Sequence, residues 1–414
     1  MTAAVTVEDA AHLTYREKTN LGSFPASSSV ATPRVRVGEF WTSRQRQASA
    51  LHEVSYRACF KPQLPAWFIE RYTKPGDVVY DPFAGRGTTA VEAALRGRRV
   101  VSNDVNPLSQ ILARPRLAIP SLQDVCARLD RISPMLASPS AAALSGVPDL
   151  SMFYERRTLV EILALRHYLQ ERRASGIEDD ADRWLRMVAT NRLTGHSPGF
   201  FSVYTLPPNQ ATTPARQIKI NAVRGNTPEY RDVARLILKK TKQLLSDLDS
   251  TARENLRAAA RDAVFLENPA DSTPQISGGR VSLVVTSPPF LDVVQYAQDN
   301  WLRCWFNHIN TDAISENITL CRTLPAWAGF ISNAFRELYR VVRSGGHVAF
   351  EVGEVRNGTL RLEETVVPAA ENNGFICREI LINTQTFTKT ANIWGVSNNT
   401  SGTNTNRIII LQKP

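Results

Sequence analysis

The chain has 414 residues, 43% of them hydrophobic, and its 49 basic residues outnumber 39 acidic ones to give a net charge of +10. This length exceeds the size at which single hydrophobic cores stop growing, so we predict one α/β core with an inserted or appended unit. No apolar run approaches the roughly 18 residues of a membrane helix, and no signal-peptide pattern opens the sequence. The five cysteines are odd in number and lack metal-ligand spacing. These features argue against a membrane protein, a disulfide scaffold or a metal site, and favour a cytoplasmic location.

Residues 1–45 are rich in small and polar residues, and we expect them to form a flexible arm. Residues 46–112 then alternate between helix and strand patterns. Within them, residues 78–89 read Val-Val-Tyr-Asp-Pro-Phe-Ala-Gly-Arg-Gly-Thr-Thr, which predicts a strand, a glycine-rich turn and the start of a helix. Glycines in this turn let the backbone approach a ligand closely. The next strand ends at Asp104, and an acid about 20 residues after such a turn suits the hydroxyl groups of a ribose.

The turn alone leaves two classes of ligand open. A nicotinamide-binding protein could contain it, although the usual Gly-x-Gly-x-x-Gly fingerprint is absent. Asp81, just before the turn, would repel a pyrophosphate and is better placed to meet the amino group of a methionine-like ligand.

Residues 113–255 interrupt the alternation of strands and helices. Apolar residues recur at helical spacing over 122–133, 153–173, 180–193 and 228–250, with a loop-and-strand stretch expected between them at 195–227. We therefore predict an inserted, mainly helical unit, after which the core resumes over residues 256–414. Between 192 and 242 the only acids are Glu229 and Asp232, an imbalance that suits phosphate contacts. The alternative, for Lys239, Lys240 and Lys242 in particular, is a solvated helix face.

Thr-Ser-Pro-Pro-Phe at residues 286–290 directly follows the apolar run 281–285. Two prolines each fix φ at about −65° and lack an N–H, so the carbonyl groups around Ser287 and Pro288 are expected to project outward as acceptors. Such a tip can grip an amino group, and the ring of Phe290 can stack on a base flipped out of a duplex. The alternative is an ordinary Pro-Pro loop after a core strand.

Together these motifs resemble those of the amino-group DNA methyltransferases, which methylate N4 of cytosine or N6 of adenine with S-adenosylmethionine. Residues 81–89 resemble the cofactor motif of that family, and residues 286–290 resemble its catalytic motif. The resemblance implies a Rossmann-like, seven-stranded α/β sheet with an antiparallel last strand, expected at 407–411. It implies catalytic roles for Ser287, Pro288, Pro289 and Phe290. It also implies S-adenosylmethionine contacts from Lys61, Asp81, Phe83, Gly85, Gly87, Thr88, Asp104, Asp262 and Ala263, the last two of which would hold the adenine.

Duplex DNA is the expected substrate, and the inserted unit is the candidate target recognition region. The candidate DNA contacts there are Arg192, His196, Asn209, Gln210, Arg216, Lys219 and Arg224. Gln217 and Asn221 share the bidentate capacity to read base edges, although polar residues also crowd into ordinary loops. Lys389 and Arg407, in a polar hairpin before the closing strand, would contact the flipped base or its phosphate unless this segment is a solvent loop.

Serine at the first position of the tip, in place of Asp or Asn, is the pattern that in this family favours cytosine N4 over adenine N6. We therefore expect a site-specific DNA (cytosine-N4) methyltransferase in a restriction–modification setting, with or without a cognate restriction endonuclease. The oligomeric state is not predicted. Three alternatives stay open: an adenine-N6 enzyme, an RNA or protein amide methyltransferase, and a non-catalytic nucleic-acid-binding module. The large insertion precedes Asp262, whereas family members of this motif order carry the recognition region after the adenine-binding acid, so the segment that reads the target is also open.

Overall fold

The computed structural model describes residues 16–17, 33–38, 40, 48–56, 59–205, 211–289, 299–312, 314, 321, 323–352, 361–384 and 405–414. In this part of the chain, nine strands form one sheet in the order β1-β2-β8-β9-β7-β6-β3-β4-β5. Their bounds are β1 Arg16–Glu17, β2 Arg34–Gly38, β3 Val78–Asp81, β4 Arg99–Asn103, β5 Val264–Leu266, β6 Val281–Thr286, β7 Val342–Val352, β8 Ile376–Thr384 and β9 Thr405–Gln412.

The predicted sheet with an antiparallel last strand is confirmed over β3 to β9. Strands β5, β4, β3, β6 and β7 pair in parallel with one another, in that order. Strand β9 contains the expected residues 407–411 and lies antiparallel between β7 and β8. Every residue of β3 and β6 is buried, as expected for parallel strands with both faces covered.

The sheet extends beyond these seven strands because part of the predicted flexible arm is strand. β2 pairs in parallel with β8, and β1 pairs antiparallel with β2. Val35 and Val37 pack against the core, and the guanidinium of Arg36 donates to the carboxylate of Glu379 at 2.6 Å. The alternation Arg-Val-Arg-Val is the period-two pattern of a half-buried strand, so the signal for β2 was present in the sequence.

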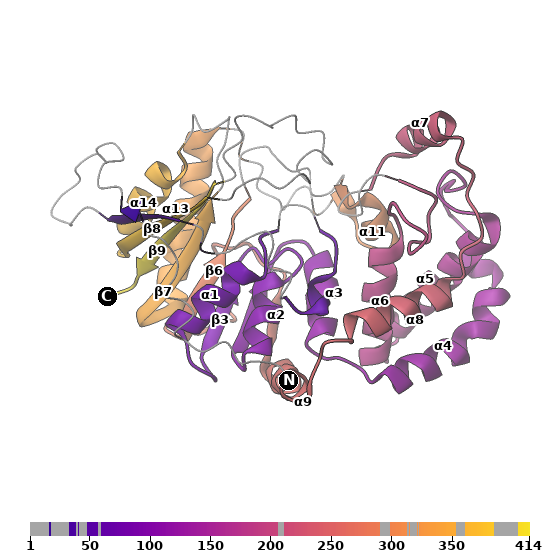
Figure 1. Ribbon diagram of the computed structural model, residues 1–414, viewed down its shortest axis with the longest axis horizontal. Helices are drawn as coiled ribbons and strands as arrows, with labels where there is room; N and C mark the ends of the chain where they lie inside the picture. The colour runs from indigo at the N-terminus through magenta and orange to yellow at the C-terminus, as the bar shows by residue number, and fades with distance from the viewer. Residues whose placement is uncertain are drawn as a thin grey trace.

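Helices cover both faces of the sheet (Figure 1). On one face, the cluster that contains Val79 and Leu283 also contains side chains of α1 (Gln63–Tyr72), α2 (Thr88–Leu95) and α9 (Ser250–Asp262). On the other face, Tyr80 and Val284 pack with α13 (Leu324–Val341) and α14 (Glu363–Glu371). Neighbouring strand residues thus enter opposite cores, which follows from the alternation of side chains along a strand.

The inserted residues form a helical unit beside the sheet (Figure 1). Helices α4 (Leu122–Ala137), α5 (Arg156–Ala174), α6 (Asp180–Arg192) and α8 (Val233–Leu244) occupy the stretches where helical spacing predicted them. The expected loop-and-strand stretch instead contains α7 (Pro214–Arg224). The remaining helical segments are η2 (Ala50–His52), α3 (Leu108–Ala113), η3 (Arg114–Arg116), η4 (Ala141–Leu144) and α11 (Trp301–Phe306). None of the helices in the described ranges has both the length and the apolarity to cross a membrane.

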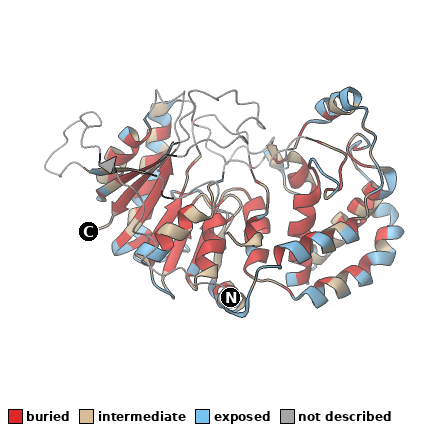
Figure 2. Cartoon of the chain, viewed as in Figure 1, coloured by how far each residue is buried: buried red, intermediate tan, exposed pale blue. Residues whose placement is uncertain are grey.

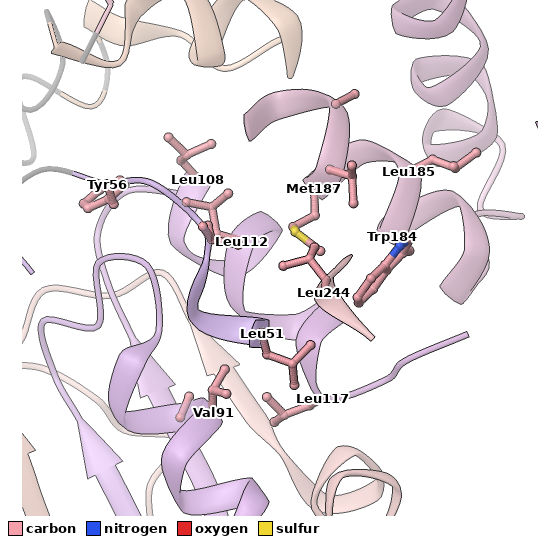
Figure 3. Close-up of a cluster of buried hydrophobic side chains, with 14 of the residues drawn as sticks. Leu51, Tyr56, Val91, Leu108, Leu112, Leu117, Trp184, Leu185, Met187 and Leu244 are labelled. Atoms are coloured by element: carbon pink, nitrogen blue, oxygen red, sulfur yellow. The ribbon is translucent and has the colours of Figure 1, made fainter. Parts of the chain in front are cut away.

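One hydrophobic cluster continues from the sheet into the helical unit. Val91 of α2 and Leu112 of α3 belong to the same buried cluster as Trp184 of α6 and Leu244 of α8 (Figure 3). Buried residues lie both in the strands of the sheet and in the helices of the inserted unit (Figure 2). The helical unit is therefore held to the sheet by apolar packing.

A buried charge network organises the helical unit. Asp182 of α6 is fully buried and accepts hydrogen bonds from Arg172 Nε at 2.7 Å, from Tyr168 Oη at 3.0 Å and from Arg128. It thereby joins α4, α5 and α6. Removing one partner of a buried ion pair leaves an uncompensated charge in a region of low dielectric.

Asp182→Ala is therefore expected to lower the free energy of unfolding by about 3 kcal/mol, because it leaves Arg128 and Arg172 without their buried acceptor. Urea denaturation followed by far-ultraviolet circular dichroism measures this change. The matched control is Asp180→Ala in the same helical turn, whose exposed carboxylate pairs with Arg183 and is expected to contribute less than about 1 kcal/mol. Equal effects of the two substitutions would contradict the network.

Candidate cofactor and catalytic site

The predicted glycine-rich turn lies between β3 and α2. Gly85 and Gly87 both adopt positive φ, 51° and 77°. A Cβ atom at Gly87 would lie 2.5 Å from Cβ of Ala113, so no other residue fits there without a shift of α3. Thr88, the first residue of α2, is buried and its hydroxyl accepts a hydrogen bond from Arg86 Nε at 3.1 Å. The turn therefore needs glycine for both its backbone conformation and its packing.

Arg116 supports this turn from behind and was not predicted. Its guanidinium is fully buried, donates to the carbonyl oxygens of Leu112 at 2.9 Å and Leu51 at 3.2 Å, and also donates to the carbonyl of Arg86 within the turn. Burial lowers the pKa of Arg116 to about 9. A single arginine after a short helix carries no sequence signal for this role, because its partners come from three separate segments.

Asp104, the expected ribose acid, lies beside the turn. Its Oδ2 accepts the N–H of Gly85 at 2.8 Å, and its Oδ1 accepts the N–H of Asn106 at 2.9 Å. Burial raises the pKa of this carboxyl to about 6. The acid is thus held next to the glycine turn at the carboxyl end of β4.

Asp81 joins the glycine-rich turn to the Ser-Pro-Pro tip. Its Oδ1 accepts the hydroxyl of Thr286 at 2.6 Å and the N–H of Phe83 at 3.1 Å. Its Oδ2 is buried and has no hydrogen-bond partner among the described residues. Burial raises the pKa of Asp81 to about 7, against the opposing effect of its hydrogen bonds. An orphaned buried carboxylate oxygen is a site for a cationic or hydrogen-donating ligand.

The tip itself is supported by neighbouring elements. The carbonyl of Pro289 accepts the indole N–H of Trp327 on α13 at 2.9 Å. The strand register pairs Thr286 with Phe350, which brings Ser287 alongside Glu351 at the end of β7. Glu351 is buried, and burial raises its pKa to about 7 while a hydrogen bond with the Ser287 side chain opposes that rise.

Glu351 was missed by the sequence analysis. The only local signal is a charged residue inside the apolar strand that runs from His347 to Val352. Its partner Ser287 is 64 positions away, and only the β6–β7 register brings the two together.

Two predicted adenine contacts lie elsewhere. Asp262 is the last residue of α9, its side chain is 54% exposed, and it pairs with Arg99 at 3.7 Å at the amino end of β4. Asp262 and Ala263 therefore precede β5 and lie at the sheet edge opposite to Asp104. The helical pattern continues to Asp262, so the strand begins only at Val264. A pocket of about 550 Å³ instead opens beside Asp104, lined in part by Val105, Pro107, Glu267, His308 and Ile309.

Two other predicted cofactor contacts flank the site. Phe83 follows Asp81, and its ring lies 5.7 Å from that of Phe330 on α13. Lys61 is half-buried just before α1.

The predicted DNA contacts divide into exposed and buried groups. His196, Arg216, Lys219 and Arg224 are exposed. Arg192 is buried with its guanidinium 4.0 Å from the ring of Phe200, which corrects the expectation that it lies on the surface. Arg407 lies on β9 and donates to the buried carboxylate of Glu363, so its charge serves an internal ion pair. Four predicted residues lie outside the described residues: Asn209, Gln210, Phe290 and Lys389.

Part of the chain is similar to known proteins. Residues 6–110 match the family model described as DNA methylase. The type II methyltransferase M.MvaI of Kocuria varians is 26% identical over 171 residues, which cover 37% of this chain and 37% of that protein. The type II methyltransferase M.MjaII of Methanocaldococcus jannaschii is 32% identical over 74 residues, 18% of this chain and 14% of that protein. The chain thus spans well under half the length of either relative.

Among solved structures, a SAM-dependent methyltransferase from Methanosarcina mazei is 11% identical, with coverage of 84% of this chain and 96% of that chain. The TM-score of this match is 0.33. The sheet order, the glycine turn and the acids beside it themselves define a Rossmann-like methyltransferase fold. Within that class, the first quarter of the chain, residues 6–110, is similar to the DNA methylase family.

The cofactor that this family implies is S-adenosylmethionine, and the residues present fit it. The orphaned Oδ2 of Asp81 suits an ammonium group. The glycines at 85 and 87 allow close approach to the backbone. Asp104 holds a carboxylate at the place where a ribose is bound in this fold.

Asp81→Asn is expected to weaken S-adenosylmethionine binding at pH 8 by about tenfold, equivalent to about 1.4 kcal/mol, because it removes the charge that faces the ammonium group. In the wild type, Asp81 ionises as pH rises through about 7, so the affinity should increase from pH 6 to pH 8. Isothermal titration calorimetry measures the dissociation constant of both proteins at each pH. Protonation of the ligand affects both proteins equally, so the ratio of the two constants reports on Asp81 alone.

The matched control is Asp262→Asn, which alters an exposed acid at the opposite edge and should leave the dissociation constant unchanged. The same pH dependence in Asp81→Asn and the wild type would show that Asp81 does not face the ligand.

Proposed function

We propose that this protein is a site-specific DNA methyltransferase that transfers a methyl group from S-adenosylmethionine to the exocyclic N4 of cytosine in duplex DNA. We also propose that it acts in a restriction–modification system, with or without a partner endonuclease. The observation that carries it is the Ser287 hydroxyl, which hydrogen bonds to the buried carboxyl of Glu351 and belongs to the residue after Thr286, the donor to Asp81. The names of the aligned relatives, both type II methyltransferases, support the same substrate class.

An exocyclic amino group is a poor nucleophile because its lone pair is delocalised into the ring. The Ser287 hydroxyl donates to Glu351, which leaves its oxygen lone pairs free to accept an N–H of the target amine. The Pro288 carbonyl is the second proposed acceptor. Two acceptors fixed before the reaction stabilise the positive charge that develops on the nitrogen, and they orient its lone pair.

S-adenosylmethionine supplies an electrophilic methyl group on a sulfonium. As the nitrogen–carbon bond forms and the sulfur–carbon bond breaks, the amine loses one proton. We propose that this proton passes through the Ser287 hydroxyl to the Glu351 carboxylate. A carboxyl with a pKa of about 7 is matched to proton acceptance near neutral pH.

The proposed site for the adenosine end of the cofactor is the pocket beside Asp104. Val105 directly follows the ribose acid, and Glu267 directly follows β5, so the pocket joins the carboxyl ends of β4 and β5. This assignment replaces Asp262 and Ala263 as the proposed adenine contacts.

A neutral serine at the tip favours cytosine N4. The second candidate is adenine N6, which needs the same two acceptors and the same flipped base. An RNA or protein amide methyltransferase would use the same cofactor turn, and a non-catalytic module would bind nucleic acid without turnover.

Purified protein with S-adenosylmethionine and unmodified duplex DNA is expected to yield N4-methyldeoxycytidine, measured by mass spectrometry of the nucleosides. Ser287→Ala should lose most of this product while it retains the cofactor dissociation constant, because the hydroxyl contacts the amine and not the cofactor. N6-methyladenine would overturn the choice of base but keep the mechanism. Methylation of RNA or protein alone, or of nothing, would overturn the DNA assignment.

Glu351→Gln is expected to reduce turnover by roughly a hundredfold, a typical loss for a proton acceptor. In the wild type, the single-turnover rate should rise as pH passes through about 7, where Glu351 ionises, and Glu351→Gln should lack that rise. Burial disfavours the ionised acid, so the amide is not expected to unfold the protein. Glu364→Gln, at an exposed acid on α14, is the control and should behave as the wild type.

A further inference from the structure

Helix α7 has polar side chains on its inward face. Gln217 is fully buried and donates to the carbonyl of Tyr204 at 2.9 Å and to Asn221 Oδ1 at 2.7 Å. Asn221 in turn donates to the carbonyl of Met152 at 2.8 Å. Arg224 lies 3.8 Å from the centre of the Tyr204 ring. Gln217 and Asn221, which the sequence suggested as base readers, therefore anchor the helix to its own unit.

The outward face of α7 is basic and aliphatic. Val223 is 87% exposed and Ile218 is 54% exposed, which makes them two of the most exposed large hydrophobic residues in the described chain. At 100° per residue, Arg216, Lys219 and Val223 share the side of the helix opposite to Gln217 and Asn221. The helix contains no acid, and its outward alanines at 215 and 222 leave room for close approach. In α7 polar side chains thus face inward and aliphatic ones are exposed, whereas an ordinary amphipathic helix buries its apolar side chains in its own protein.

The start of α7 is connected to the chain that leaves the catalytic tip. The N–H of Ala211 donates to the carbonyl of Asp299 at 2.8 Å, and the indole of Trp301 donates to the carbonyl of Thr212 at 3.1 Å. Residues 299–301 begin ten positions after Pro289. Helix α7 lies at the top of Figure 1, whereas α9, which leads into the amino end of β5, lies at the bottom. The helix thus stands on the side of the molecule where the catalytic strand ends.

We propose that α7 enters the major groove of the DNA substrate, with Val223 against base edges and with Arg216 and Lys219, which lie on either side of Val223 around the helix, on flanking phosphates. This inference rests on the proposed DNA substrate. The major groove admits an α-helix, and aliphatic side chains there distinguish thymine by contact with its methyl group. Basic residues that bind phosphates position a protein on DNA without reading the base sequence. Because α7 contains no acidic residue, it does not repel the negatively charged phosphate backbone of DNA.

The test compares Val223→Ser and Lys219→Ala in the full-length protein on a library of random duplexes, with the methylated positions read by sequencing. Val223→Ser is expected to change the preference at one position of the recognised sequence by about tenfold. Lys219→Ala is expected to weaken binding to all sequences alike and to lower the slope of log affinity against log salt by about one. Ile177→Ser, an exposed isoleucine between α5 and α6, is the control and should change neither property.

Unchanged sequence preference in Val223→Ser, together with unchanged affinity in Lys219→Ala, would overturn the α7 interface even if the enzyme methylates DNA. Fluorescence anisotropy with a labelled duplex separates this failure from failure of the proposed chemistry. If the wild type methylates no base and Lys219→Ala still weakens duplex binding, the interface stands and the methylation proposal falls.

Discussion

The hydrogen bond from Thr286 to Asp81 is the constraint on which the site depends. It is buried, 2.6 Å long, and joins residues 205 positions apart. A second hydroxyl, that of Thr89 on α2, donates to the carbonyl of Val285 on β6 at 3.1 Å. Because β3 and β6 pair in parallel, the cofactor turn and the Ser-Pro-Pro tip end at the same edge of the sheet. The carboxylate of Asp81 is buried, so water does not compete for its hydrogen bond to Thr286. This bond therefore holds the two motifs in one relative position.

Burial also sets the chemistry of this edge. Desolvation is the main cause of the raised pKa values of Asp81, Asp104 and Glu351, which reach about 7, 6 and 7. Each acid lies within one residue of the end of its strand, where apolar helices cover both faces of the sheet. The same packing that stabilises the strands thus raises the pKa values of these three carboxyl groups toward neutral pH. An incoming cation or proton then interacts with them strongly, because little water competes.

The helical unit is coupled to this edge by packing. Leu51, Leu112 and Trp184 belong to one buried cluster that crosses from the sheet to the helices (Figure 3). The unit also holds α7 through side-chain hydrogen bonds to backbone carbonyls, which fix the rotation of the helix about its axis. A helix held in this way keeps a defined orientation relative to β6, as the proposed contact of α7 with DNA requires.

The sequence by itself determined the local elements: the glycine turn, the Ser-Pro-Pro tip, the existence of the last strand and four helices of the insertion. Each depends on residues close in the chain, through backbone sterics and hydrophobic period. Only the tertiary structure decided that Glu351 lies beside Ser287, that Arg116 supports the turn, and that Asp262 lies at the far edge. It also decided that Gln217 and Asn221 face inward. These facts follow from strand register and helix rotation, which long-range packing determines and no local pattern encodes.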